Sequence, residues 1–188
     1  SVQPNDNLQN VRLQGFAGSL SDCMVCHTTP PSSPGPHGRV FGSQVTAHIP
    51  VSQNWNMISV PITVTDSRKS SLFPTSISDA FAFDLSSGYF RQDTLFNQWG
   101  YWLKFPSTQS VDIAGMTRTH DTLTVQAGWN MIGSTSLPVP TTSIIQVPSD
   151  IVASPYFGFS GVYGSADTLK PGIAYWVKVT QAGKLILR

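Results

Sequence analysis

Glutamate is absent from this chain of 188 residues, and charge of either sign is scarce. All ten acidic residues are aspartate, and lysine and arginine together number eleven. Because glutamate and lysine usually cover exposed helix faces, their scarcity beside abundant serine, threonine, glycine and proline favours strands joined by turns. A net charge of +1 gives no basic surface for nucleic acid and no polyacidic tail. Near-neutral surfaces associate readily, so we expect a homo-oligomer or polymer.

Long hydrophobic runs are missing as well. No stretch of about eighteen apolar residues occurs, so the sequence predicts no membrane span. No signal peptide is visible at the N-terminus. There is also no pair of carboxylates, no nucleophile with its base and no phosphate-binding loop in a recognisable pattern, so no enzymatic activity is predicted.

The chain has only two cysteines, Cys23 and Cys26, and His27 follows the second one directly. The spacing C-x-x-C-H is the attachment signature of c-type haem. Two thiols at this spacing reach both vinyl groups of one haem, and the adjacent imidazole is placed to ligate the iron from one face. The sequence therefore predicts one haem c per chain, with thioether bonds to Cys23 and Cys26 and with His27 as the proximal iron ligand.

A cysteine pair at this spacing has three other uses in proteins. A local disulfide between Cys23 and Cys26 stays open. A zinc site normally needs four ligands, and no second C-x-x-C or H-x-H pair is present. A redox C-x-x-C usually lies between a strand and a helix, whereas the prolines at 30, 31, 34 and 36 exclude a helix after this one.

The segment around the cysteines resembles one haem-binding unit of the multihaem c-type cytochromes. The likeness covers about twenty residues, from Ser21 through the proline-rich stretch to Gly35-Pro36-His37-Gly38. In that family the loop after C-x-x-C-H often carries a second histidine, which implies His37 as the candidate distal iron ligand. His48 and His120 remain alternatives, including ligation from an adjacent subunit, while the strand-like runs around Met57 and Met131 disfavour methionine. Because haem is attached covalently outside the cytoplasm in bacteria, we expect export, with Ser1 as the mature N-terminus.

Three blocks recur later in the chain at a constant offset of 74 residues. They are Trp-Asn-Met-Ile at 55–58 and 129–132, Asp-Thr-Leu at 93–95 and 167–169, and Tyr-Trp-x-Lys at 101–104 and 175–178. Phe83 and Phe157 fall at the same offset. The constant offset predicts a duplicated module. Alternating runs at 45–50, 80–85, 100–105, 122–126 and 183–187 predict short strands, with helical turns expected within 71–78 and 142–147.

The fold class expected is therefore mainly β: residues 1–42 form an arm and an irregular haem segment, and two tandem repeats, 43–115 and 116–188, form small β-sandwich or barrel modules. The W-N-[ML]-I and G-Y-W-[LV]-K blocks resemble β modules of large secreted proteins of Gram-negative bacteria. That resemblance implies an extracellular or cell-surface location and a structural role; many proteins with such modules carry a C-terminal sorting domain that is later removed.

The four repeated tryptophans, at 55, 102, 129 and 176, are expected to be core anchors because they recur at equivalent positions. Trp99 has no counterpart and is the better candidate for a surface or haem contact. Together these features predict an extracellular monohaem c-type cytochrome that transfers electrons and is suited to self-assembly into a filament or surface array. The alternatives are a structural or adhesive surface protein, in which haem or a disulfide is only a staple, and a carbohydrate-binding module in which exposed aromatic residues form a sugar-binding platform, with Trp99 as the residue whose replacement tests it.

Overall fold

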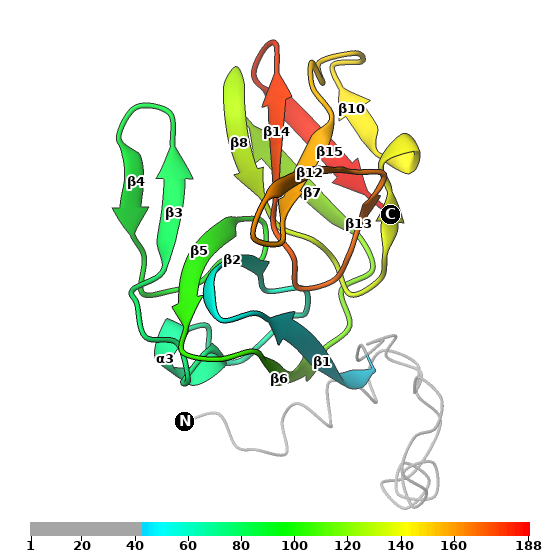
Figure 1. The fold of residues 1–188 in the computed structure, drawn as a ribbon. Helices are drawn as coiled ribbons and strands as arrows, with labels where there is room; N and C mark the ends of the chain where they lie inside the picture. Colours follow the sequence, from blue (N-terminus) through cyan, green and yellow to red (C-terminus); the bar gives the residue numbers. More distant parts are fainter. Residues whose placement is uncertain (1–42) are drawn as a thin grey trace, which may run out of the picture. The chain divides into compact units, whose positions relative to one another are not determined.

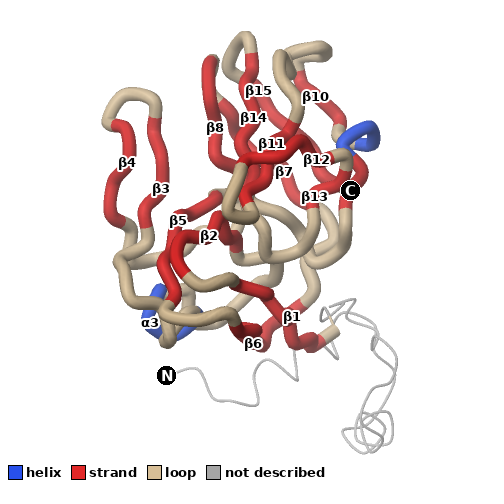
Figure 2. Tube along the Cα trace, in the orientation of Figure 1, coloured by secondary structure: helices blue, strands red, loops and turns tan. Residues whose placement is uncertain are grey.

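Strands dominate the computed structural model, which describes residues 43–188 (Figures 1 and 2). The prediction of a mainly β chain is confirmed for these residues. The predicted arm and haem segment, 1–42, lie outside the described residues. The elements are β1 Gln44–Val51, β2 Asn54–Ser59, α3 Lys69–Leu72, β3 Phe81–Asp84, β4 Gly88–Arg91, β5 Gly100–Phe105, β6 Gln109–Met116, β7 Asp121–Val125, β8 Gly128–Ile132, β9 Val139–Pro140, a 3-10 turn Thr141–Ser143, β10 Ile145–Val147, β11 Tyr156–Phe159, β12 Tyr163–Ala166, β13 Thr168–Leu169, β14 Tyr175–Val179 and β15 Gly183–Leu187.

The five predicted strands are present with ends that differ by no more than one residue. Alternation identified them because one face of each strand is buried and the other is not. The expected helical turns are present only in part, as α3 and the 3-10 turn, and both begin before the predicted ranges.

The two halves of the described chain contain four-stranded sheets of matching order. The first half forms the antiparallel sheet β2-β5-β3-β4, and the second forms β8-β14-β11-β12. Trp55 pairs with Lys104 in the first sheet, and Trp129 pairs with Lys178 in the second, 74 residues later. Smaller sheets accompany them, β1-β6 in the first half and β10-β15-β7 in the second.

The prediction that Phe83 and Phe157 occupy equivalent positions in the two halves is wrong. Phe81 lies opposite Trp102 on the neighbouring strand, and the residue that lies opposite Trp176 is Phe157. The offset is therefore 76 residues in β3 and β11, and the true counterpart of Phe83 is Phe159. It returns to 74 at β4 and β12 because the hairpin from Phe159 to Tyr163 is two residues shorter than the one from Phe83 to Tyr89. Equal and opposite length changes hid the shift in the sequence.

Each half has its own hydrophobic core, to which its four-stranded and its smaller sheet both contribute. In the first half, the fully buried Leu103 and Phe105 of β5 pack with Ile49 of β1 and Ile113 of β6. In the second half, Val177 of β14 packs in the same way with Leu123 and Leu185. A third cluster joins the halves and contains Met57, Met131, Ala174 and Trp176.

Three side chains of the Trp-Asn-Met-Ile block have different structural roles: the asparagine closes a turn, and the methionine and the isoleucine lie in different hydrophobic clusters. Asn56 closes the turn before β2: its Oδ1 accepts the N–H of Ser52 at 2.8 Å, and its Nδ2 donates to the Ser52 carbonyl at 2.8 Å. Asn130 makes the same pair of bonds to Gln126, at 2.9 and 2.8 Å. The methionine of each block lies in the cluster between the halves, and the isoleucine lies in the core of its own half.

The tyrosine of the Tyr-Trp-x-Lys block makes the same kind of hydrogen bond in both halves. The hydroxyl of Tyr101 accepts the backbone N–H of Phe96 at 2.7 Å, and Tyr175 accepts that of Lys170 at 2.8 Å. Burial raises the pKa of both phenols. The predicted turn at Lys170-Pro171-Gly172 is present, with Gly172 at φ +80°, a conformation that glycine adopts without steric cost.

Gly100 lies at a close contact between the two halves. A Cβ at this position would lie 2.6 Å from the Cβ of Ala174 and 2.7 Å from Cγ of Met131. Since Ala174 is the counterpart of Gly100 in the second half, the contact has room for one methyl group and not for two. We expect Gly100→Ala to lower the free energy of unfolding by about 1–3 kcal/mol, measured by urea denaturation.

The matched control moves the methyl group across the contact. Gly100→Ala combined with Ala174→Gly is expected to recover stability relative to Gly100→Ala alone, because the overlapping pair is removed. If the two substitutions simply add, the contact between these residues does not limit packing, and the explanation fails.

Candidate functional site

The predicted haem ligands Cys23, Cys26, His27 and His37 lie outside the described residues. The two alternative iron ligands lie on the described surface. His48 is on β1 with 69% of its side chain exposed, and its Nδ1 lies 2.7 Å from Oδ1 of Asp112 on β6. His120 is exposed, and its Nδ1 lies 2.8 Å from the hydroxyl of Thr119.

The most distinctive site of the described residues is a pair of hollows lined by aromatic rings. The first, of about 420 Å³, and the second, of about 380 Å³, fall at the lower end of the size range of small-ligand sites. The first is lined by Phe83, Trp129, Phe157, Tyr163 and Trp176; the second is lined by Trp55, Phe81, Tyr89, Trp102 and Phe159. We call them the Trp129 hollow and the Trp55 hollow.

The alternation of side chains along the strands places these rings on one face. Trp102 of β5 and Phe81 of β3 point away from the core, whereas their neighbours Leu103 and Ala82 are fully buried in it. In the first half, Trp55 lies 6.1 Å from Phe81 and 6.5 Å from Trp102, centroid to centroid. In the second half, the corresponding ring distances are 6.1 and 6.4 Å.

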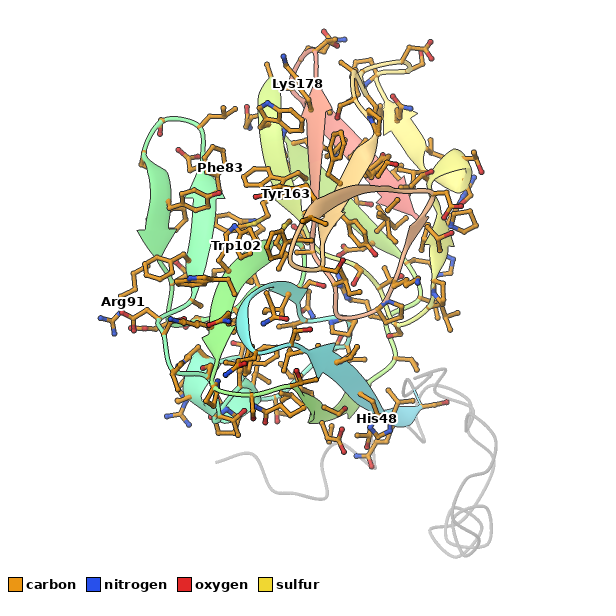
Figure 3. All side chains as sticks on the ribbon, viewed as in Figure 1. His48, Phe83, Arg91, Trp102, Tyr163 and Lys178 are labelled. Atoms are coloured by element: carbon orange, nitrogen blue, oxygen red, sulfur yellow. The ribbon has the colours of Figure 1, made fainter. Side chains whose placement is uncertain are left out.

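Each half also inserts a ring against the other half. Phe83 lies 4.8 Å from Trp176, and Phe159 lies 4.9 Å from Trp102, both edge to face. Figure 3 shows Phe83, Trp102 and Tyr163 close together beside the strands of both sheets. The backbone contacts are reciprocal too: Ser59 donates to the Gly172 carbonyl at 2.9 Å, and Gly133 donates to the Gln98 carbonyl at 3.0 Å. The two hollows are therefore equivalent products of one contact between the halves.

The expectation that all four repeated tryptophans are core anchors is wrong for Trp55 and Trp129, which are 41% and 39% exposed. Only Trp176 is buried, because Phe83 of the other half covers it. Trp99 is 39% exposed, which confirms its surface position; it lies against Phe90 and Phe96. Recurrence in the sequence could not distinguish a core face from an exposed face, since both repeat.

The hollows are suited to bind apolar groups. Ring faces and edges line them, and the polar groups that these side chains bring are indole N–H and phenol O–H groups. Burial raises the pKa of Tyr163, while a hydrogen bond with the Trp176 side chain acts in the opposite direction. The phenol at this rim therefore stays neutral and can donate a hydrogen bond across the physiological pH range.

A largely buried arginine also connects the two halves, and no sequence pattern indicated it. Arg118, in the connection between β6 and β7, forms an ion pair with Asp121; their side chains are 13% and 11% exposed. Its Nη2 donates to the carbonyls of Ser134 at 2.7 Å, Asn97 at 3.3 Å and Val60 at 3.4 Å. Because the acceptors come from both halves, this one side chain bridges the two halves.

Residues 43–188 contain no cluster of three or more histidine, cysteine, aspartate or glutamate side chains arranged to hold a metal ion. Within the same residues, no helix has the length and apolar character needed to cross a membrane. Comparison with family models, with curated proteins and with solved structures finds no match to the chain.

Proposed function

We propose that this protein is an extracellular monohaem c-type cytochrome, in which a covalently bound haem transfers single electrons and the β body supports self-association. The observation that carries the proposal is the motif Cys23-x-x-Cys26-His27, formed by the only two cysteines of the chain. The donor set suits haem, since two thiols form the thioether bonds and an imidazole ligates the iron. When bound, haem supplies a one-electron redox couple.

The distal ligand that we propose is His37. His48 is the alternative with support from the described residues, because Asp112 holds its Nδ1 and so fixes the ring orientation and leaves Nε2 to face a metal. A hydrogen bond of this kind is a common feature of metal-ligating histidines. In this case the iron would be that of the same chain or of an adjacent subunit.

The described residues support a scaffold more than a catalyst. We propose that the two halves are duplicated modules, given the matching strand orders and the Trp–Lys pairings at an offset of 74 residues. Their rings leave exposed apolar hollows, which on a stable protein mark interaction sites. Surface location follows from covalent haem attachment outside the cytoplasm and stays part of the proposal.

The test is a visible spectrum of the purified protein, oxidised and then reduced with dithionite, together with a denaturing gel stained for haem. We expect sharp α and β bands on reduction and a stained chain. His37→Ala is expected to convert the six-coordinate spectrum to a high-spin one, whereas the control His120→Ala leaves it unchanged. The absence of a Soret band and of haem stain would overturn the proposal.

A second candidate function is that of a structural or adhesive surface protein, in which haem or a Cys23–Cys26 disulfide only stabilises its segment. The exposed aromatic hollows favour it, since they provide a binding surface without redox chemistry. Redox titration separates the two: a reversible haem couple supports electron transfer, and a haem that a chemical mediator does not reduce and reoxidise supports the structural role.

A further inference from the structure

The Trp129 and Trp55 hollows are exposed, and ten aromatic residues line them, five in each hollow. Trp55, Trp129, Tyr89 and Tyr163 are between 39% and 54% exposed. Exposing rings of this size to water has a free-energy cost, because burial of apolar surface is the main driving force of folding and association. A ligand that covers these rings would therefore gain substantial binding free energy.

The lining restricts the chemistry of that ligand. A sugar that enters an all-aromatic hollow would bury hydroxyl groups with few partners, at a cost for each unpaired group. An ordinary peptide would bury backbone N–H donors in the same way. A proline-rich segment avoids this problem because proline has no N–H, and its ring packs on aromatic faces while the carbonyls accept bonds from indole and phenol donors. Aromatic-lined grooves recognise P-x-x-P segments for these reasons.

The chain itself contains such a segment. Residues 30–36 read Pro-Pro-Ser-Ser-Pro-Gly-Pro, with four prolines and no charged side chain, and Pro31 and Pro34 form a P-x-x-P pair. In a polyproline II helix of three residues per turn, residues at this spacing lie on the same side. An uncharged segment also suits hollows without a charged lining residue, since no charge loses its hydration.

We propose that the Trp129 and Trp55 hollows bind the proline-rich segment, residues 30–36, of a second copy of this chain. Each copy carries both the segment and the hollows, so the contact is heterologous and can add further copies. A net charge of +1 provides little repulsion between copies. The inference rests on the self-association in the function proposed above and names the surfaces that perform it.

The first experiment measures the association of the full-length chain by sedimentation velocity over a range of concentrations. We expect wild-type chains to self-associate and the variant Trp55→Ala/Trp129→Ala to be weakened by roughly tenfold or more at each hollow, since buried aromatic anchors dominate interfaces. Trp99→Ala is the matched control: this tryptophan is equally exposed but lies outside both hollows, so association stays at the wild-type level.

A mixing experiment tests the pairing directly. Chains with Trp55→Ala/Trp129→Ala keep the segment and lose the hollows, whereas chains with Pro31→Ala/Pro34→Ala keep the hollows and lose the segment. At concentrations where the wild type associates, each variant alone is expected to remain monomeric, and an equal mixture is expected to form a one-to-one complex. A monomeric wild type, self-association of either variant at the wild-type level, or a mixture that fails to associate would overturn the proposal.

Two measurements keep these outcomes interpretable. A synthetic peptide of residues 28–38 should dissociate wild-type assemblies, and the same peptide with alanine for Pro31 and Pro34 should not; this comparison needs no folded variant. The haem spectrum of each chain is recorded in parallel. Loss of haem with association intact would count against the cytochrome alone, and loss of association with the haem spectrum intact would count against the docking alone.

Discussion

Chains in which alanine replaces both Cys23 and Cys26 are expected to carry no covalently bound haem. The two thiols are the only groups of the chain that can form thioether bonds, so their removal leaves no site of attachment. A denaturing gel stained for haem should lose the band completely, while a protein stain still shows the chain. His27→Ala should also disturb the spectrum, because the proximal nitrogen is lost.

The control for this prediction is Met24→Ala, which changes a residue between the cysteines and leaves all three haem-binding side chains in place. Its haem stain should match the wild type. Mass spectrometry under non-reducing conditions can contradict this prediction. A wild-type mass that is two hydrogens below the mass of the reduced apoprotein would identify a disulfide and refute covalent haem.

Replacement of Arg118 by alanine is expected to lower the free energy of unfolding by about 3–5 kcal/mol, the range for breaking one side of a buried ion pair. The variant leaves the Asp121 carboxylate without its partner and removes the donor to the Ser134 carbonyl. Urea denaturation measures the loss. Because Arg118 contacts both halves, the two hollows should also change, which tryptophan fluorescence of the folded variant detects.

Arg91 provides the comparison on the surface. It pairs with Asp79 and Asp93 at 3.3 and 3.4 Å, but its side chain is 62% exposed. Arg91→Ala should therefore cost less than about 1 kcal/mol. Adding Asp121→Asn to Arg118→Ala should restore part of the stability, since no unpaired charge then remains. Equal losses for Arg118→Ala and Arg91→Ala would contradict the structural role of the buried pair.

Several features were predictable from the sequence because their cause is local. Alternation along 45–50 and 183–187 identified β1 and β15, and Pro171-Gly172 identified a turn, since proline and glycine each fix a backbone conformation. The recurring Trp-Asn-Met-Ile block marked two equivalent strand entries, although the turn-closing role of its asparagine became evident only with the hydrogen bonds of Asn56 and Asn130.

The aromatic hollows could not be predicted in this way. A strand with large apolar residues on both faces has the same sequence pattern whether its outer face is exposed or packed on a second sheet. Trp102 of β5 is an intermediate case, because it is half-buried and Phe159 of the other half covers part of it. The two-residue shift of β11 was equally invisible, because the shorter hairpin after Phe159 cancels it. Arg118 looked like any surface arginine, and only its four partners from both halves reveal its role.

Local patterns were enough to predict a chain of short strands with recurring blocks and one motif suited to covalent haem, because strand periodicity, turn residues and thiol spacing act over a few neighbouring residues. Which face of each sheet is covered and which is open became evident only in the folded molecule. That choice depends on how two sheets distant in sequence pack against each other: Phe83 contacts Trp176 and Phe159 contacts Trp102, whereas Trp55 and Trp129 stay exposed.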